Sequence, residues 1–172
     1  FHQIHAVVQE AAARDPKLAG MGTTLTVACS SGRHLLIAHL GDSRVYLFRQ
    51  QRLRQLTHDH TLAQELVDRG RLPSTQAAAP RLRHALTRAI GGANDEVSAD
   101  VDLSKLEDGD RLLLCTDGLT DMVDDATIAG ILGQSNSSAA DCRALVDAAL
   151  SRGGRDNVTV VVACYRIPDE VG

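Results

Sequence analysis

The chain has 172 residues, of which 44% are hydrophobic and 23% charged, a composition typical of one globular domain and unlike that of a disordered chain. Its formal net charge of −4 and its 2% of aromatic residues argue against a nucleic-acid partner, because phosphate backbones attract basic surfaces and single strands stack on aromatic rings. No apolar run approaches the roughly 20 residues that span a bilayer, so we expect no membrane contact in this segment.

The first third of the sequence predicts a helix followed by strands. Apolar residues spaced i, i+3, i+4 and i+7 predict an amphipathic helix over residues 2–13. β-rich runs follow at residues 23–30, 34–40 and 43–49, with a short fourth at 52–56. Ser31-Gly32 and Gly41-Asp42 separate the first three runs and are dipeptides typical of hairpins. We therefore expect an antiparallel meander.

The remainder of the sequence mixes helices and strands. Thr61 is a good N-cap and predicts a helix at 61–69. The elements predicted after it are a loop at 72–80, strands at 96–103 and 110–116, helices at 126–132 and 139–152, and a strand at 157–165. The last strand is a nearly continuous β-branched run, for which we expect burial on both faces or a place in the centre of a sandwich. Hairpin-connected strands interleaved with helices predict an α+β layered domain.

Cysteine usage favours a reducing compartment. Cys29, Cys115, Cys142 and Cys164 form no Cys-x-x-Cys pair and show no disulfide-like spacing. Within apolar runs a free thiol behaves as a small hydrophobic group. We interpret the four as reduced structural residues of a cytoplasmic protein, with a zinc or redox site as the alternative.

Three aspartates lie at predicted strand ends beside small residues. Asp42 stands in Gly-Asp-Ser-Arg, Asp117 in Thr-Asp-Gly and Asp156 in Arg-Asp-Asn. Carboxylates with small neighbours suit Mg²⁺ or Mn²⁺, which prefer oxygen ligands and keep several waters. An aspartate in a tight turn is, however, more often a turn former or cap, and spacing alone does not bring the three together. The local chemistry leaves both readings open.

Six runs in one order resemble the motifs of a known family. They are Gly20–Thr24, His39–Tyr46, Leu56–Thr61, Leu86–Gly91, Leu113–Asp121 and Arg155–Thr159. Together they span nearly all of residues 20–165, and they resemble the PPM-type metal-dependent serine/threonine protein phosphatases, the protein phosphatase 2C family, in their compact bacterial form. The resemblance implies an αββα sandwich of two antiparallel sheets flanked by helix pairs, N-terminally truncated. It also implies a single domain over residues 1–172 with a flap at about 57–80.

The resemblance implies hydrolysis of phosphoserine and phosphothreonine in proteins by a metal-activated water at a binuclear Mn²⁺ or Mg²⁺ site. Asp117 and Asp156 match the family aspartates that bind the second core metal, and Asp42 with Asp117 matches the pair that holds a third, more labile ion. The implied partners are phosphoprotein substrates of a serine/threonine kinase. The family's upstream Asp-Gly motif and phosphate-gripping arginine have no counterpart here, so catalytic and substrate-binding residues stay unassigned. We expect this chain alone to be inactive; the alternative is a non-catalytic module that binds a phosphoprotein or a regulatory partner.

Other polar residues invite a functional reading that we consider weaker. The run His58, Asp59 and His60 resembles a metal cluster in composition, but we interpret it as a turn that anchors the flap. Histidines of the first helix, His2 and His5, are expected on a solvated face. For Arg83 and Arg88 we favour ion pairs over contact with a substrate phosphate, and Asp121 is either a helix cap or a support for the neighbouring Asp117.

Overall fold

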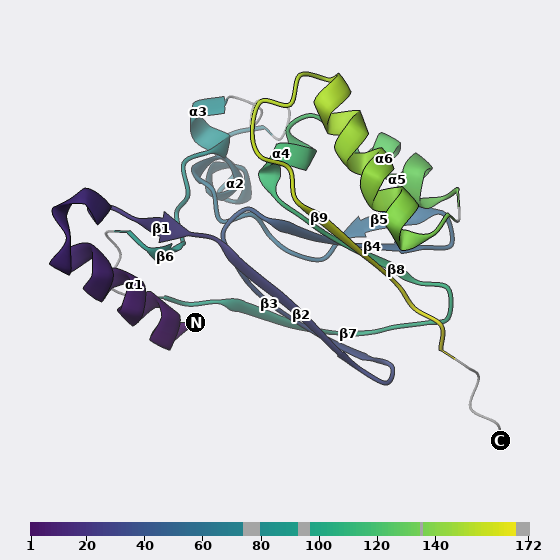
Figure 1. Ribbon diagram of the computed structural model, residues 1–172, viewed down its shortest axis with the longest axis horizontal. Coiled ribbons are helices and arrows are strands. Elements are labelled where there is room, and N and C mark those ends of the chain that lie inside the picture. Colours follow the sequence, from purple (N-terminus) through teal and green to yellow (C-terminus); the bar gives the residue numbers. More distant parts are fainter. Residues whose placement is uncertain (74–79, 93–96, 135, 168–172) are drawn as a thin grey trace. The chain divides into compact units, whose positions relative to one another are not determined.

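A computed structural model describes residues 1–73, 80–92, 97–134 and 136–167 (Figure 1). The chain divides into two compact units: unit 1 comprises 1–27, 38–42 and 58–101, and unit 2 comprises 28–37, 43–57 and 102–172. The helices are α1 (His2–Arg14), η1 (Pro16–Leu18, a 3₁₀ turn), α2 (Leu62–Asp68), α3 (Pro80–Arg83), α4 (Asp117–Thr120), α5 (Asp125–Leu132) and α6 (Ser138–Ser151). The strands are β1 (Gly22–Thr23), β2 (Leu25–Ser31), β3 (His34–Leu40), β4 (Arg44–Arg49), β5 (Arg52–Gln55), β6 (Ile90–Gly91), β7 (Asp100–Lys105), β8 (Arg111–Cys115) and β9 (Val160–Cys164).

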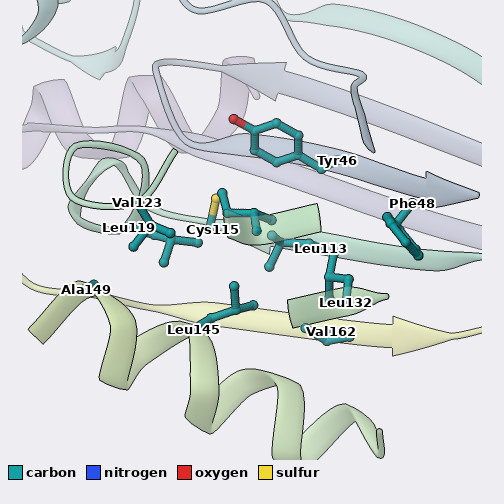
Figure 2. Close-up of a cluster of buried hydrophobic side chains, with 11 residues drawn as sticks. Tyr46, Phe48, Leu113, Cys115, Leu119, Val123, Leu132, Leu145, Ala149 and Val162 are labelled. Carbon is teal, nitrogen blue, oxygen red and sulfur yellow. The ribbon is translucent and has the colours of Figure 1, made fainter. Parts of the chain in front are cut away.

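Unit 2 is built on a four-stranded antiparallel sheet in the order β5-β4-β8-β9. Side chains alternate between its two faces, as the two-residue period of a strand requires. Tyr46 and Phe48 of β4 point to the face covered by α5 and α6 (Figure 1). There they join the cluster that Figure 2 shows, in which Leu113 of β8 and Leu145 of α6 are fully buried. This cluster fixes the helical layer on the sheet.

The opposite face of the same sheet is also buried. Val45 and Leu47 of β4 pack with Leu35 and Ile37 of β3 and with Leu112 of β8. Because β3 pairs with β2 and β7 in a second sheet, these contacts are the sheet-on-sheet layer of a sandwich. The antiparallel sheets and flanking helices confirm the α+β prediction.

Unit 1 has a smaller core and a two-stranded pairing of β1 with β6. Leu40, Ile90 and Val97 are buried in this core, and Phe1 and Val8 from the α1 region pack against them. His5 of α1 is buried as well, and its Nδ1 accepts a hydrogen bond from the backbone N–H of Gly91 (3.0 Å). The prediction of a solvated face is therefore wrong for His5, whereas His2 is exposed.

Three sequence predictions need correction. The meander is wrong at Gly41-Asp42, because β3 and β4 belong to different sheets and this turn carries the chain from one to the other. The strand predicted at 96–103 lies instead at β7, from Asp100 to Lys105. The strand predicted at 157–165 is only β9, which lies at the edge of its sheet. Val162 alone is buried in it and Val161 is 54% exposed, so neither burial on both faces nor a place in the centre of a sandwich is found.

The expectation of one domain with a flap at 57–80 stays a prediction. Within the predicted loop at 72–80, residues 74–79 lie outside the described part of the chain. The helix before it is confirmed as α2, whose cap Thr61 accepts a hydrogen bond from the N–H of Gln64.

Candidate metal site

Asp117 begins a helical turn at the end of a buried strand. β8 is hydrogen-bonded to β4 on one side and to β9 on the other, and its residues Leu112 and Leu113 are almost fully buried. Thr116 follows as the N-cap of α4, and half-buried Asp117 is the first residue of that helix. The position of this carboxylate is therefore set by a core strand.

Thr116 ties this turn to the segment that leads into β9. Its backbone N–H donates to the carbonyl oxygen of Thr159 (3.1 Å), and its hydroxyl donates to the carbonyl oxygen of Asn157 (3.2 Å). The same hydroxyl oxygen accepts from the N–H of Thr159 (3.0 Å). These three bonds hold the Thr-Asp-Gly and Arg-Asp-Asn motifs next to each other.

Gly118 permits a still closer approach of the two motifs. A Cβ at this position would lie 2.3 Å from the carbonyl oxygen of Asn157 and 3.4 Å from that of Asp156. Any side chain larger than hydrogen would therefore separate α4 from the chain that enters β9 (Figure 1). The structure thus brings together the loops of Asp117 and Asp156, which the sequence alone did not.

The chemistry of this pair of loops fits a hard divalent cation. Both side chains offer carboxylate oxygens, which Mg²⁺ and Mn²⁺ prefer. Asp156 is exposed and accepts a hydrogen bond at Oδ1 from the N–H of Asn157 (2.7 Å). A hydrated ion can reach an exposed carboxylate without losing all its waters. These residues therefore fit the metal that the motifs imply, and their role as ligands stays a proposal.

Asp42 occupies a turn in unit 1. It follows Gly41, whose φ of +117° is a conformation that favours glycine. A Cβ on Gly41 would lie 2.3 Å from the Cγ2 of Thr24. Because Asp42 belongs to unit 1 and the other two aspartates to unit 2, the convergence of all three stays a prediction.

Two buried histidines lie beside this turn. The rings of His39 and His60 are 4.9 Å apart between centroids and tilted by 30°. Burial, and then the neighbouring His60, lowers the pKa of His39 to about 4, and burial also lowers the pKa of His60. Both rings are therefore neutral at pH 7. His39 donates from Nε2 to the carbonyl oxygen of His58 (3.1 Å) and accepts at Nδ1 from the hydroxyl of Thr26 (2.9 Å).

The remaining candidate residues lie mostly in ion pairs or caps. His58 contacts Asp68 through Nε2 (2.7 Å), and Arg88 donates to Asp100 (2.8 Å), so the ion-pair reading of Arg88 is the one the structure supports. Asp121 is the C-cap residue of α4, and its N–H donates to the carbonyl oxygen of Asp117 (2.8 Å). Arg83 lies in α3.

Sequence reasoning missed the residues that support these loops. Thr116, Gly118 and Asn157 flank the predicted ligands, yet only their backbone geometry shows that they touch. The only sequence feature that pointed to these residues is that they stand directly beside the aspartates, in Thr-Asp-Gly and in Asp-Asn. All four cysteines are free in the structure; Cys115 is buried, whereas Cys29 and Cys164 are exposed.

The fold and the paired aspartate loops define the class of protein. The chain belongs to the protein phosphatase 2C family, whose sequence model matches residues 2–158. It is 45% identical over 149 residues to "Serine/threonine protein phosphatase PstP" of Mycobacterium tuberculosis (strain CDC 1551 / Oshkosh), covering 87% of this chain and 28% of that protein. It is 39% identical over 167 residues to "Protein phosphatase PhpP" of Streptococcus pneumoniae serotype 2 (strain D39 / NCTC 7466), covering 97% of this chain and 65% of that protein.

Solved structures agree with this assignment. The crystal structure of the Mycobacterium tuberculosis serine/threonine phosphatase PstP/Ppp superposes with a TM-score of 0.87 at 41% identity, over 94% of this chain and 68% of that one. The catalytic domain of PstP in complex with two manganese ions gives a TM-score of 0.82 at 41% identity, over 92% and 65%. The chain thus spans between about a quarter and two thirds of the length of these relatives.

Proposed function

We propose that the protein containing this chain hydrolyses phosphoserine and phosphothreonine in proteins, using Mn²⁺ or Mg²⁺ held in part by Asp117, Asp156 and Asp42. The observation that carries the proposal is the contact of Gly118 with the backbone of Asn157, which sets the loops of two predicted ligands side by side. The names of the relatives and the two manganese ions in the PstP structure support it.

Each aspartate contributes charge at a fixed place. Divalent ions bound at such a site supply an activated water nucleophile and neutralise the phosphate oxygens. Asp117, at the end of β8, provides a ligand that the core sheet holds in position. Asp156, on the neighbouring loop, provides a second carboxylate that solvent reaches. Asp42, in the Gly41 turn, provides the ligand for a further and more weakly held ion.

The proposal extends to substrates and location. The substrates are phosphoproteins, since one relative is named a serine/threonine protein phosphatase, and phosphate on serine and threonine implies a serine/threonine kinase as their source. Four free cysteines fit a reducing compartment, so we place the protein in the cytoplasm. Among the described helices, none has the length and apolar character needed to cross a membrane.

The test compares Asp117→Asn with Asp147→Asn in the intact protein. Asp147 is an exposed aspartate of α6 and provides the same chemical change outside the two loops. Turnover of a phosphothreonine peptide in a Mn²⁺ titration should vanish in Asp117→Asn and stay unchanged in Asp147→Asn, with both variants folded. Wild-type turnover in Asp117→Asn refutes the ligand assignment. If the wild-type protein binds the phosphopeptide but does not hydrolyse it, the proposal of catalysis is refuted and a binding function takes its place.

A further inference from the structure

We propose that His60 is a positioning residue that fixes the Gly41-Asp42 turn and thereby sets the affinity of the metal ion that Asp42 binds. The inference rests on the proposed function, because it assumes that Asp42 is a ligand. The sequence alone predicts for His60 only a place in a turn that anchors the flap. The contacts of its ring and backbone point to this more specific task.

Two hydrogen bonds of opposite direction join His60 to Gly41. The N–H of Gly41 donates to Nδ1 of His60 (3.0 Å), and the N–H of His60 donates to the carbonyl oxygen of Gly41 (2.8 Å). Both polar groups of Gly41 are thus satisfied by one residue. Gly41 is buried, has a positive φ and lies between β3 and β4, outside both strands. His60 therefore pairs the backbone groups that a neighbouring strand would pair within a sheet.

The orientation of the His60 ring is itself fixed. Because Nδ1 accepts from Gly41, the ring hydrogen is on Nε2, which donates to Oδ2 of Asp100 (3.1 Å). The other oxygen of Asp100 accepts from Arg88 (2.8 Å). A chain of contacts therefore runs from Arg88 through Asp100 and His60 to the backbone next to Asp42. Groups that orient a metal ligand typically lower metal affinity 10–100-fold when they are lost, and here the orienting contacts are made to the residue directly before Asp42.

Packing removes the remaining freedom of the ring. His60 is 2% exposed and lies against His39 of β3, which is bonded to Thr26 of β2. On its other side the turn lies close to Thr24, because a Cβ on Gly41 would be only 2.3 Å from the Cγ2 of that residue. The turn is therefore held from both sides, and Asp42 is the first residue after the held segment.

A matched pair of substitutions separates positioning from mere packing. In His60→Asn the side-chain oxygen takes the place of Nδ1 and still accepts from Gly41. In His60→Leu the side chain has nearly the same shape as asparagine but accepts nothing. A histidine that only fills space would make the two variants alike in metal binding, whereas a positioning histidine makes them differ.

The experiment measures Mn²⁺ binding to the intact protein by titration calorimetry, alongside the amide resonance of Gly41 without metal. We expect His60→Leu to weaken the lowest-affinity Mn²⁺ step about tenfold or more and to shift the Gly41 resonance. His60→Asn should stay within about threefold of wild type and keep the resonance near its wild-type position. Asp42→Asn is the reference for complete loss of this step.

The outcomes distinguish the two proposals. If Asp42→Asn and Asp117→Asn weaken Mn²⁺ binding but folded His60→Leu does not, the positioning role is overturned and the proposed function survives. If neither aspartate variant changes Mn²⁺ binding, the ligand assignment falls, and the metal role of His60 falls with it. Should His60→Leu not fold, Asp100→Ala removes the ring's other partner and is expected to weaken the same Mn²⁺ step by a few-fold; unchanged binding in that variant overturns the proposal.

Discussion

Replacing Gly118 with alanine tests the contact that joins the two aspartate loops. A Cβ there would lie 2.3 Å from the carbonyl oxygen of Asn157 and 2.9 Å from its carbonyl carbon. Both are backbone atoms, so no side-chain rotation relieves the overlap, and overpacking of this kind costs about 1–3 kcal/mol. Moving the Asn157 segment away also weakens its hydrogen bonds to Thr116, each contributing about 1 kcal/mol. We expect the free energy of unfolding to fall by roughly 3 kcal/mol.

Helix propensity alone predicts the opposite sign. Gly118 lies in α4 without a positive φ, and alanine is favoured over glycine within a helix by about 1 kcal/mol. Gly130 of α5 is the matched control, because a Cβ there meets nothing within 4 Å. Gly130→Ala should therefore stabilise the protein by up to about 1 kcal/mol.

The assay is urea unfolding of the intact protein, paired with Mn²⁺ titration calorimetry. Gly118→Ala should lower both stability and Mn²⁺ affinity, whereas Gly130→Ala should leave Mn²⁺ affinity unchanged. If Gly118→Ala is as stable as the wild type and binds Mn²⁺ equally well, the close approach of the loops is not what holds the site together.

Two further predictions concern buried polar contacts in the separate units. Arg49→Met should lower the free energy of unfolding by roughly 3 kcal/mol, because the fully buried carboxylate of Asp110 loses the guanidinium that binds both of its oxygens. Urea unfolding measures this loss. Recovery of stability in Arg49→Met/Asp110→Asn would show that the unpaired buried charge is the cause. His5→Leu should lower the free energy of unfolding by about 1–3 kcal/mol, because the N–H of Gly91 is left unpaired, and His5→Asn should restore part of this loss. Equal unfolding free energies for the two variants would contradict this reasoning.

Local sequence patterns predicted the helices and strands better than they predicted which strands pair with one another. The helix α1, the strand β3 and the cap at Thr61 follow from apolar spacing, a short apolar run between turn dipeptides and hydroxyl capping, all of which act within a few residues. Gly41-Asp42 misled because the same dipeptide serves a hairpin and a crossover between sheets. Only the positions of β3 and β4 in different sheets decide between them, and no local preference carries that information.

Long-range contacts account for the rest. The sequence pattern on α1 placed His5 on a polar face, yet Gly91, far along the chain, supplies a buried N–H that needs an acceptor there. The closeness of Asp117 to the chain at Asp156 likewise depends on the ladder between β8 and β9 and on the absence of a side chain at Gly118. Such pairings depend on the whole fold, which is why the motifs pointed to these residues through a family resemblance and not through spacing.

His39 should make the folded state sensitive to acid between pH 6.5 and pH 4. Burial lowers the pKa of His39 to about 4, so in this interval the unfolded chain binds a proton that the folded chain does not. The contribution of neutral His39 to the free energy of unfolding is therefore complete above pH 6.5 and is lost as the pH falls toward 4. A pKa difference of about 2.5 corresponds to about 3 kcal/mol. His39→Asn keeps an acceptor for the hydroxyl of Thr26 but does not titrate. The stability advantage of the wild type over His39→Asn should therefore shrink by about this amount from pH 6.5 to pH 4 in urea unfolding, and parallel pH curves for the two proteins would rule out His39 as the cause.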